Sequence, residues 1–85
     1  MKVLYFAWLR QRIGMEAEIV SPPASVTTVG ALLEWLKTQS ARHAEALKDP
    51  SVVRVAVNQE YARLGDQLAP DDEVALFPPV TGGTR

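Results

Sequence analysis

The chain of 85 residues has no cysteine and only one histidine, His43. Without thiols it cannot form a disulfide framework, a zinc ribbon or a thiol nucleophile, so any sulfur chemistry must use another group. With one imidazole and scattered carboxylates, we expect no multi-ligand metal site. A chain of this size forms one domain with little room for a deep internal cavity, so chemistry is expected at the surface.

An excess of charge of one sign is also missing. Nine Lys and Arg residues face ten Asp and Glu residues, which gives a net charge of -1. No basic stripe is present to neutralise phosphates, so nucleic acid is not an expected partner. The apolar run from Val3 to Leu9 ends at Arg10 and Arg12, too early for a signal-peptide core or a membrane span. We expect no membrane attachment and a cytoplasmic location.

The N-terminal residues have the pattern of a β-hairpin. Residues Lys2 to Trp8 are rich in aromatic and branched side chains, which favours a strand. Residues Glu16 to Val20 alternate in polarity and predict a half-buried second strand. Between them, Leu9 to Ile13 form a short turn or helix that Gly14 closes.

Residues Thr28 to Thr38 predict the main helix, because four apolar residues recur at helical spacing and Thr28 suits the N-cap. This apolar stripe consists of Val29, Leu32, Leu33 and Leu36. A weaker helix is predicted from Ala41 to Lys48, where His43 is expected to be a surface residue. Trp35 and Trp8 are expected to be partly buried packing residues rather than ligand platforms.

Three further strands are predicted in the second half of the chain. The first is Val52 to Val57, and the tight turn Asn58-Gln59 leads from it into a short strand near Tyr61 to Leu64. The last strand is Glu73 to Phe77, and Pro78-Pro79 ends it. The element order predicts an α+β fold in which a mixed four- to five-stranded sheet packs on one main helix. We expect a domain over residues 1–79 and a flexible C-terminal tail over residues 80–85.

The orientation of the aromatic residues depends on the strand register. If Tyr5 and Leu76 face the helix, then Phe6 and Phe77, one position further on, face outward. Together with Tyr61 they would form an exposed apolar surface, which usually marks an interface. The opposite register would bury Phe6 and Phe77, and residue parity alone does not distinguish the two.

The tail begins after Pro78-Pro79, which fix two backbone dihedrals, and continues as Val80-Thr81-Gly82-Gly83. Two residues without Cβ can pass through a narrow channel and allow close approach to the main-chain carbonyl. The alternative is that Gly82-Gly83 belong to an ordinary disordered end.

The run Phe77-Pro78-Pro79-Val80-Thr81-Gly82-Gly83 resembles the C-terminus of the small subunit of molybdopterin synthase. The resemblance begins at Asp72 and also covers Val3 to Ala7, Thr28-Val29 and Ala56 to Gln59, so it spans nearly the whole chain. It implies the β-grasp fold shared with ubiquitin, in agreement with the element order. The Phe-Pro-Pro-Val-Thr-Gly-Gly run is its most specific part.

The resemblance implies a sulfur carrier for molybdenum cofactor biosynthesis. An adenylating enzyme would activate the Gly83 carboxylate with ATP, and sulfur would replace AMP to give a thiocarboxylate. The tail would then enter the large synthase subunit and donate sulfur to cyclic pyranopterin monophosphate, forming molybdopterin. The chain itself would be a non-catalytic subunit without a stably bound cofactor, in a heterotetramer of two small and two large subunits. Besides Gly82 and Gly83, the residues expected to contact partners are Phe6, Tyr61, Phe77, Pro78, Pro79, Val80 and Thr81.

The chain departs from this pattern at Thr84-Arg85, because an amide at Gly83 leaves no carboxylate to adenylate. Either a protease removes the two residues, or they were added in cloning, or the protein is inactive as written; we favour the first two. Three other functions compete with the molybdopterin pathway. They are a thiamine-type sulfur carrier, which usually lacks the Phe-Pro-Pro run, a ubiquitin-like modifier joined to lysine through Gly83, and a plain interaction module.

Overall fold

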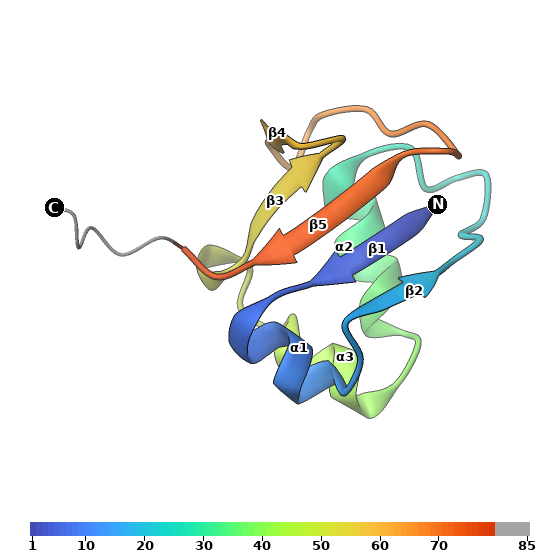
Figure 1. The fold of residues 1–85 in the computed structure, drawn as a ribbon. Helices are drawn as coiled ribbons and strands as arrows, with labels where there is room; N and C mark the ends of the chain where they lie inside the picture. The colour runs from blue at the N-terminus through green and yellow to red at the C-terminus, as the bar shows by residue number, and fades with distance from the viewer. Residues whose placement is uncertain (80–85) are drawn as a thin grey trace, which may run out of the picture.

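Five strands form one mixed sheet in the computed structural model, which describes residues 1–79 (Figure 1). In their order across the sheet these strands are β2 (Ala17–Ile19), β1 (Lys2–Tyr5), β5 (Glu73–Phe77), β3 (Arg54–Val57) and β4 (Glu60–Ala62). β1 and β5 run parallel, and the other neighbours are antiparallel. The predicted α+β fold with a mixed sheet is confirmed, whereas the predicted tail lies outside the described residues.

The helices cover one face and one end of this sheet. Helix α2 (Val29–Lys37) lies behind the sheet in Figure 1, and the shorter helices α1 (Ala7–Ile13) and α3 (Ala41–Ala46) pack together below it. A short 3-10 helix, η1 (Pro50–Val52), leads into β3. One main helix was predicted correctly, and the two short helices complete the layer that it begins. No helix in residues 1–79 is long and apolar enough to span a bilayer.

The core lies between α2 and the sheet. The predicted stripe of α2 is buried along its whole length, and each of these side chains contributes about 1.5 to 3 kcal/mol through burial. Thr28 caps the helix as predicted, since its side-chain oxygen accepts a hydrogen bond from the Ala31 N–H. Trp35 and Trp8 are partly buried against the core, as expected. The sheet, the short helices and the residues next to them supply the other large buried hydrophobic side chains, which are Val3, Tyr5, Leu9, Ile13, Val20, Leu47, Val53, Val55, Val74 and Leu76.

Gly30, in the first turn of α2, marks a close approach between the helix and the loop after β4. Its N–H cannot find a partner inside the helix and donates instead to the Leu64 carbonyl at 2.8 Å. A Cβ at this position would lie 3.2 Å from the same oxygen. Glycine lowers the stability of a helix relative to alanine. Here this loss is offset by the close contact with the Leu64 carbonyl, which a larger residue would strain.

The first strand is shorter than predicted. It ends at Tyr5 rather than Trp8, because Ala7 adopts a left-handed backbone conformation with φ 56° and turns the chain into α1. Leu9 and Ile13, four residues apart, then bury one side of this helix. Gly14 ends it as predicted, with φ 92° and its N–H bonded to the Arg10 carbonyl.

Candidate functional site

The face of the sheet turned away from α2, which we call the outer face, carries an apolar row across all five strands. Leu4 pairs with Ala17 on one side and Ala75 on the other. Ala75 in turn pairs with Ala56, and Ala56 with Tyr61. Directly paired residues project from the same face, so these five side chains form one band with small residues at its centre.

The burial pattern decides the register that residue parity left open. Tyr5 and Leu76 are buried at 1% and 0% exposure, so both face α2. Phe6 is 49% exposed, and Phe77, next to the buried Leu76, lies partly exposed on the outer face. The outward register is confirmed, and the alternative that buries both phenylalanines is wrong.

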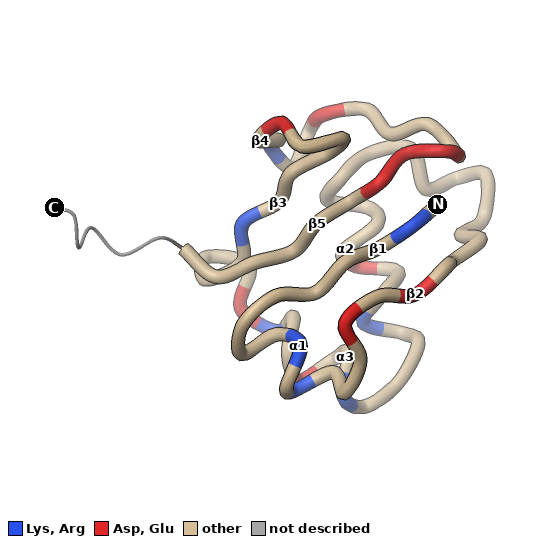
Figure 2. Tube along the Cα trace, in the orientation of Figure 1, with Lys and Arg blue, Asp and Glu red and all other residues tan. Residues whose placement is uncertain are grey.

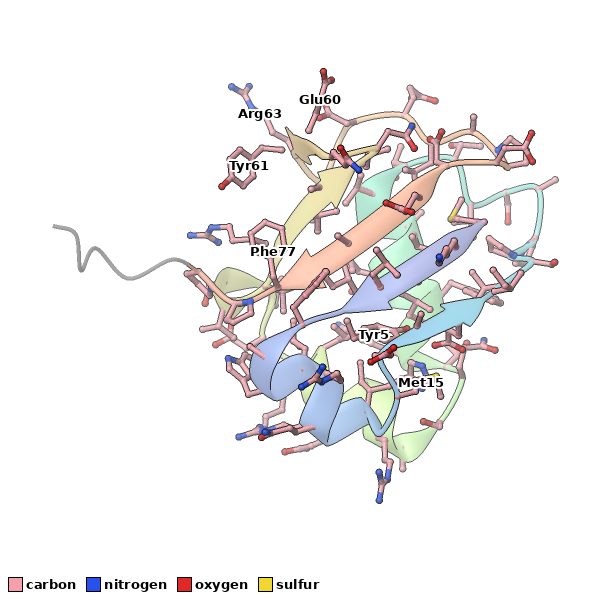
Figure 3. The ribbon with its side chains drawn as sticks, viewed as in Figure 1. Tyr5, Met15, Glu60, Tyr61, Arg63 and Phe77 are labelled. Carbon is pink, nitrogen blue, oxygen red and sulfur yellow. The ribbon has the colours of Figure 1, made fainter. Side chains whose placement is uncertain are left out.

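Two of the predicted aromatic residues, Tyr61 and Phe77, lie side by side at one end of the outer face (Figure 3). The rings of Tyr61 and Phe77 are 5.9 Å apart between centroids and tilted by 48°. Tyr61, on the edge strand β4, is 81% exposed. The Phe6 N–H donates to the Leu76 carbonyl at 3.1 Å, which holds Phe6 next to the end of β5. The structure therefore brings Tyr61 and Phe77 together and places the backbone of Phe6 beside the end of β5.

Pro78 and Pro79 follow directly after this aromatic end and are both half-buried. Pro79 lines a hollow of about 360 Å³ with Arg54, Tyr61 and Phe77. Because proline has no N–H, the ladder of β5 cannot continue past Phe77. The chain therefore leaves the sheet beside the aromatic residues. The other predicted tail residues, Val80, Thr81, Gly82 and Gly83, lie outside the described residues.

The two ends of the outer face differ in charge. At the start of β5, Lys2 pairs with Glu73, and acidic residues cluster just before this strand (Figure 2). At the aromatic end, Arg54 pairs with Phe77. Among the paired strand residues, Arg54 is therefore the cation that lies beside the aromatic side chains.

A network of hydrogen bonds fixes the start of β5. Asn58 donates from Nδ2 to Asp72 at 3.0 Å and accepts at Oδ1 from the Glu73 N–H at 3.0 Å. The Ala69 N–H donates to the second oxygen of Asp72 at 2.8 Å. This backbone bond, followed by that from Asn58, lowers the pKa of Asp72. Asp72 thus stabilises the turn that leads into β5.

The prediction that His43 lies on the surface is wrong, because the side chain is buried at 4% exposure. Its Nε2 lies 2.7 Å from Glu18 Oε2, and its Nδ1 lies 2.7 Å from Ser40 Oγ. The Tyr5 hydroxyl donates to the same oxygen of Glu18 at 2.6 Å. The physical reason is that Glu18 projects inward from edge strand β2 and needs donors inside the fold.

Ser40 and Glu18 hold the His43 ring from both sides. Ser40 Oγ accepts from the His43 N–H at the N-cap of α3 and lies within hydrogen-bond distance of Nδ1, and a carboxylate oxygen accepts, so Nε2–H donates to Glu18. Burial, with the bond and charge of Glu18, raises the pKa of Tyr5. Alternation along β2 could have indicated that Glu18, between Ala17 and Ile19, faces inward, but not that His43 is its partner. Within residues 1–79, no three His, Asp or Glu side chains form a possible metal-binding group.

Comparison with known proteins shows the family of this chain. The model of the ThiS family matches residues 3–83 of the chain. The chain belongs to the ThiS family. A molybdopterin synthase sulfur carrier subunit of Escherichia coli is 45% identical over 82 residues, covering 96% of this chain and 98% of the relative. The human sulfur carrier subunit is 38% identical over 85 residues, covering 96% and 92%. These matches confirm the predicted resemblance to the small subunit of molybdopterin synthase.

Solved structures agree with this ThiS-family assignment. A putative molybdopterin converting factor subunit 1 from Pyrococcus furiosus superposes with a TM-score of 0.76 at 33% identity, covering 93% of this chain and 95% of that chain. Small archaeal modifier protein 1 of Haloferax volcanii has a TM-score of 0.74 at 32% identity, covering 94% and 97%. A complex of subunits 1 and 2 of molybdopterin-converting factor from Helicobacter pylori matches at 24% identity with a TM-score of 0.61, covering 96% of each chain. This last similarity shows the fold alone, and the predicted β-grasp fold is confirmed.

Proposed function

We propose that this chain is the sulfur-donating subunit of a molybdopterin synthase and carries sulfur as a thiocarboxylate on Gly83. The observation that supports this function is the position of the aromatic end of the outer face, which only Pro78-Pro79 separate from Val80-Thr81-Gly82-Gly83 in the sequence. A partner that covers Phe6, Tyr61 and Phe77 would receive the following residues of the chain at the edge of its contact surface.

The chemistry uses the main chain rather than a side chain. The Gly83 carboxylate attacks the α-phosphate of ATP in a partner adenylating enzyme, which releases pyrophosphate and forms an acyl adenylate. A sulfide-level donor then displaces AMP and leaves a thiocarboxylate. A carboxylate is a poor acyl donor, and adenylation supplies the leaving group that the exchange needs. In the large subunit, the thiocarboxylate gives its sulfur to cyclic pyranopterin monophosphate, and water restores the carboxylate.

Gly82 and Gly83 suit this role because they carry no Cβ. A partner can then approach the terminal carbonyl from any side, through a channel too narrow for larger residues. The absence of cysteine is compatible with the function, because the sulfur is carried on the main-chain terminus. We predict no stably bound cofactor in this chain, with ATP bound by the adenylating enzyme.

We infer that the large subunit covers the outer face and that two small and two large subunits form a heterotetramer. The 45% identity to the sulfur carrier subunit of molybdopterin synthase from Escherichia coli supports this type of partner. The residues proposed to contact it are Phe6, Tyr61, Phe77, Pro78, Pro79, Val80 and Thr81. A cytoplasmic location stays a prediction.

The proposed chemistry requires a free carboxylate on Gly83, so the peptide bond to Thr84 must be absent from the active form. We test this with a form of the chain that ends at Gly83, incubated with ATP, the adenylating enzyme and a sulfide source. Intact-mass analysis should show exchange of one oxygen for sulfur. The matched control is the chain ending at Arg85, which should keep its mass. A form ending at Gly83 that never gains sulfur would contradict the proposal.

A second function is favoured by the similarity to small archaeal modifier protein 1. In a protein modifier, Gly83 would form an isopeptide bond with a lysine of another protein. The two functions are separated by mass spectrometry of lysates, because conjugated lysines carrying the C-terminal residues of this chain would appear only in the second.

A further inference from the structure

Arg54 is a cation of the outer face at its aromatic end. It pairs with Phe77 across the β3–β5 ladder, so both side chains project from the same face. It also lines the hollow that Tyr61, Phe77 and Pro79 border. Arg54 is exposed, and it stands where the proposed partner surface meets the start of the tail.

No carboxylate of residues 1–79 neutralises this guanidinium. The ion pairs within residues 1–79 involve other residues. The Arg54 side chain donates one long hydrogen bond of 3.3 Å to the Ser51 carbonyl. A guanidinium has five N–H donors, so most of the donors of Arg54 remain solvated in the isolated chain.

A partner that covers Tyr61 and Phe77 must also cover Arg54, because the three side chains border one hollow. Covering removes water from the guanidinium, and an unpaired charge in an interface opposes binding. The partner therefore has to supply an acceptor at this position. A carboxylate is the best match, since it neutralises the charge and accepts two parallel N–H bonds.

We propose that Arg54 binds an Asp or Glu side chain of the large synthase subunit, next to an apolar side chain that contacts Phe77 and Tyr61. This inference rests on the proposed function, because it specifies a contact of the same partner surface. The ion pair between Arg54 and this carboxylate fixes the orientation of the two subunits where the chain leaves β5, and so directs the tail toward the partner.

The test measures the Kd between the large subunit and four forms of the chain: the unsubstituted chain, Arg54→Glu, Arg54→Lys and Arg42→Glu. Arg54→Glu should bind about 30-fold more weakly or worse, because it places two carboxylates against each other. Arg54→Lys should show a smaller loss, since a point charge replaces the fork of donors. Arg42, exposed on α3, is the matched control, and its reversal should change Kd by less than about 2-fold.

A second set of variants tests the proposed ion pair between Arg54 and the carboxylate directly. Asp and Glu residues on the docking surface of the large subunit are changed to Lys one at a time and combined with Arg54→Glu. One such variant should restore most of the lost affinity. Binding of Arg54→Glu with unchanged Kd would overturn the Arg54 inference and leave the proposed function standing. Failure of the unsubstituted chain to bind at all would overturn both.

Discussion

Gln59 occupies a backbone position that residues with a side chain rarely adopt. In the turn between β3 and β4, Asn58 has φ 50° and Gln59 has φ 71°. Two consecutive left-handed residues match the twist of the flanking strands, which is why Asn-Gly is the favoured pair in such turns. Asn58 fits this preference, whereas Gln59 stands where glycine would be expected.

Gln59→Gly should therefore stabilise the protein. Relief of the left-handed strain outweighs the greater chain entropy of glycine, so we expect a gain of about 0.5 to 1 kcal/mol in the free energy of unfolding. Chemical denaturation followed by circular dichroism measures the change. The control is Gln11→Gly on the exposed side of α1, which should lose about 1 kcal/mol. Equal losses at both positions would show that the turn is not strained.

His43 shows what the sequence could not predict at the scale of a residue. A lone histidine in a short polar helix is usually solvated, and its contact with the nearby Ser40 does not by itself indicate burial. Its partner, Glu18, lies 25 residues earlier and on another element. The pairing follows from packing α3 near edge strand β2, a long-range contact that local patterns do not contain.

At the scale of elements, predictions succeeded where local signals mark the end of an element. Strand β5 was predicted residue for residue, because Pro78-Pro79 end it. Helix α2 was predicted to within a residue at each end, owing to its apolar stripe and Thr28 cap. The start of α1 was missed because Ala7 adopts a positive φ that no residue preference indicates. The sequence left two possibilities for the outer face, with Phe6 and Phe77 either exposed or buried, since alternation does not show which side of a strand packs against the helix.

The buried network joins three elements, and its strength can be measured through Tyr5 on β1. Tyr5→Phe removes the donor to Glu18, on β2, so we expect a loss of about 1 to 2 kcal/mol in the free energy of unfolding at neutral pH. A double-mutant cycle with His43→Ala, on α3, should show coupling, because both side chains donate to the same oxygen.

The cost of Tyr5→Phe should depend on pH. The pKa of Tyr5 is raised in the folded protein above its ordinary value of 10.0, so above this pH the unfolded chain loses a proton that the folded protein keeps. The stability contributed by Tyr5 is full below pH 10.0 and falls by about 1.4 kcal/mol per pH unit above it. The stability curves of wild type and Tyr5→Phe should therefore converge in alkali. Tyr61→Phe, at an 81% exposed position, is the control, and parallel curves for Tyr5→Phe would contradict the burial of its hydroxyl.

At the scale of the whole molecule, the position of β5 connects the fold with the proposed function. β5 lies at the centre of the sheet and pairs with β1 on one side and β3 on the other. Its end is therefore held by ladders on both sides, while α2 occupies the opposite face (Figure 1). A partner on the outer face can cover both the sheet and the point where the chain leaves it without contacting α2.

Phe77 provides the test of this arrangement, because it is the last residue of β5 and its side chain lies on the outer face. Phe77→Ala should weaken binding to the large subunit by at least about 10-fold, since a buried aromatic side chain near the centre of an interface is a typical hot spot. The fold should persist, because the core on the α2 side of the sheet is untouched. Titration calorimetry measures the affinity, and thermal unfolding checks the fold. Leu64→Ala is the matched control, as it removes a 53% exposed apolar side chain beside Gly30 of α2, and its Kd should stay unchanged. If both substitutions weakened binding equally, or if Phe77→Ala unfolded the protein, the outer face would not be the surface that directs Gly83 to its partner.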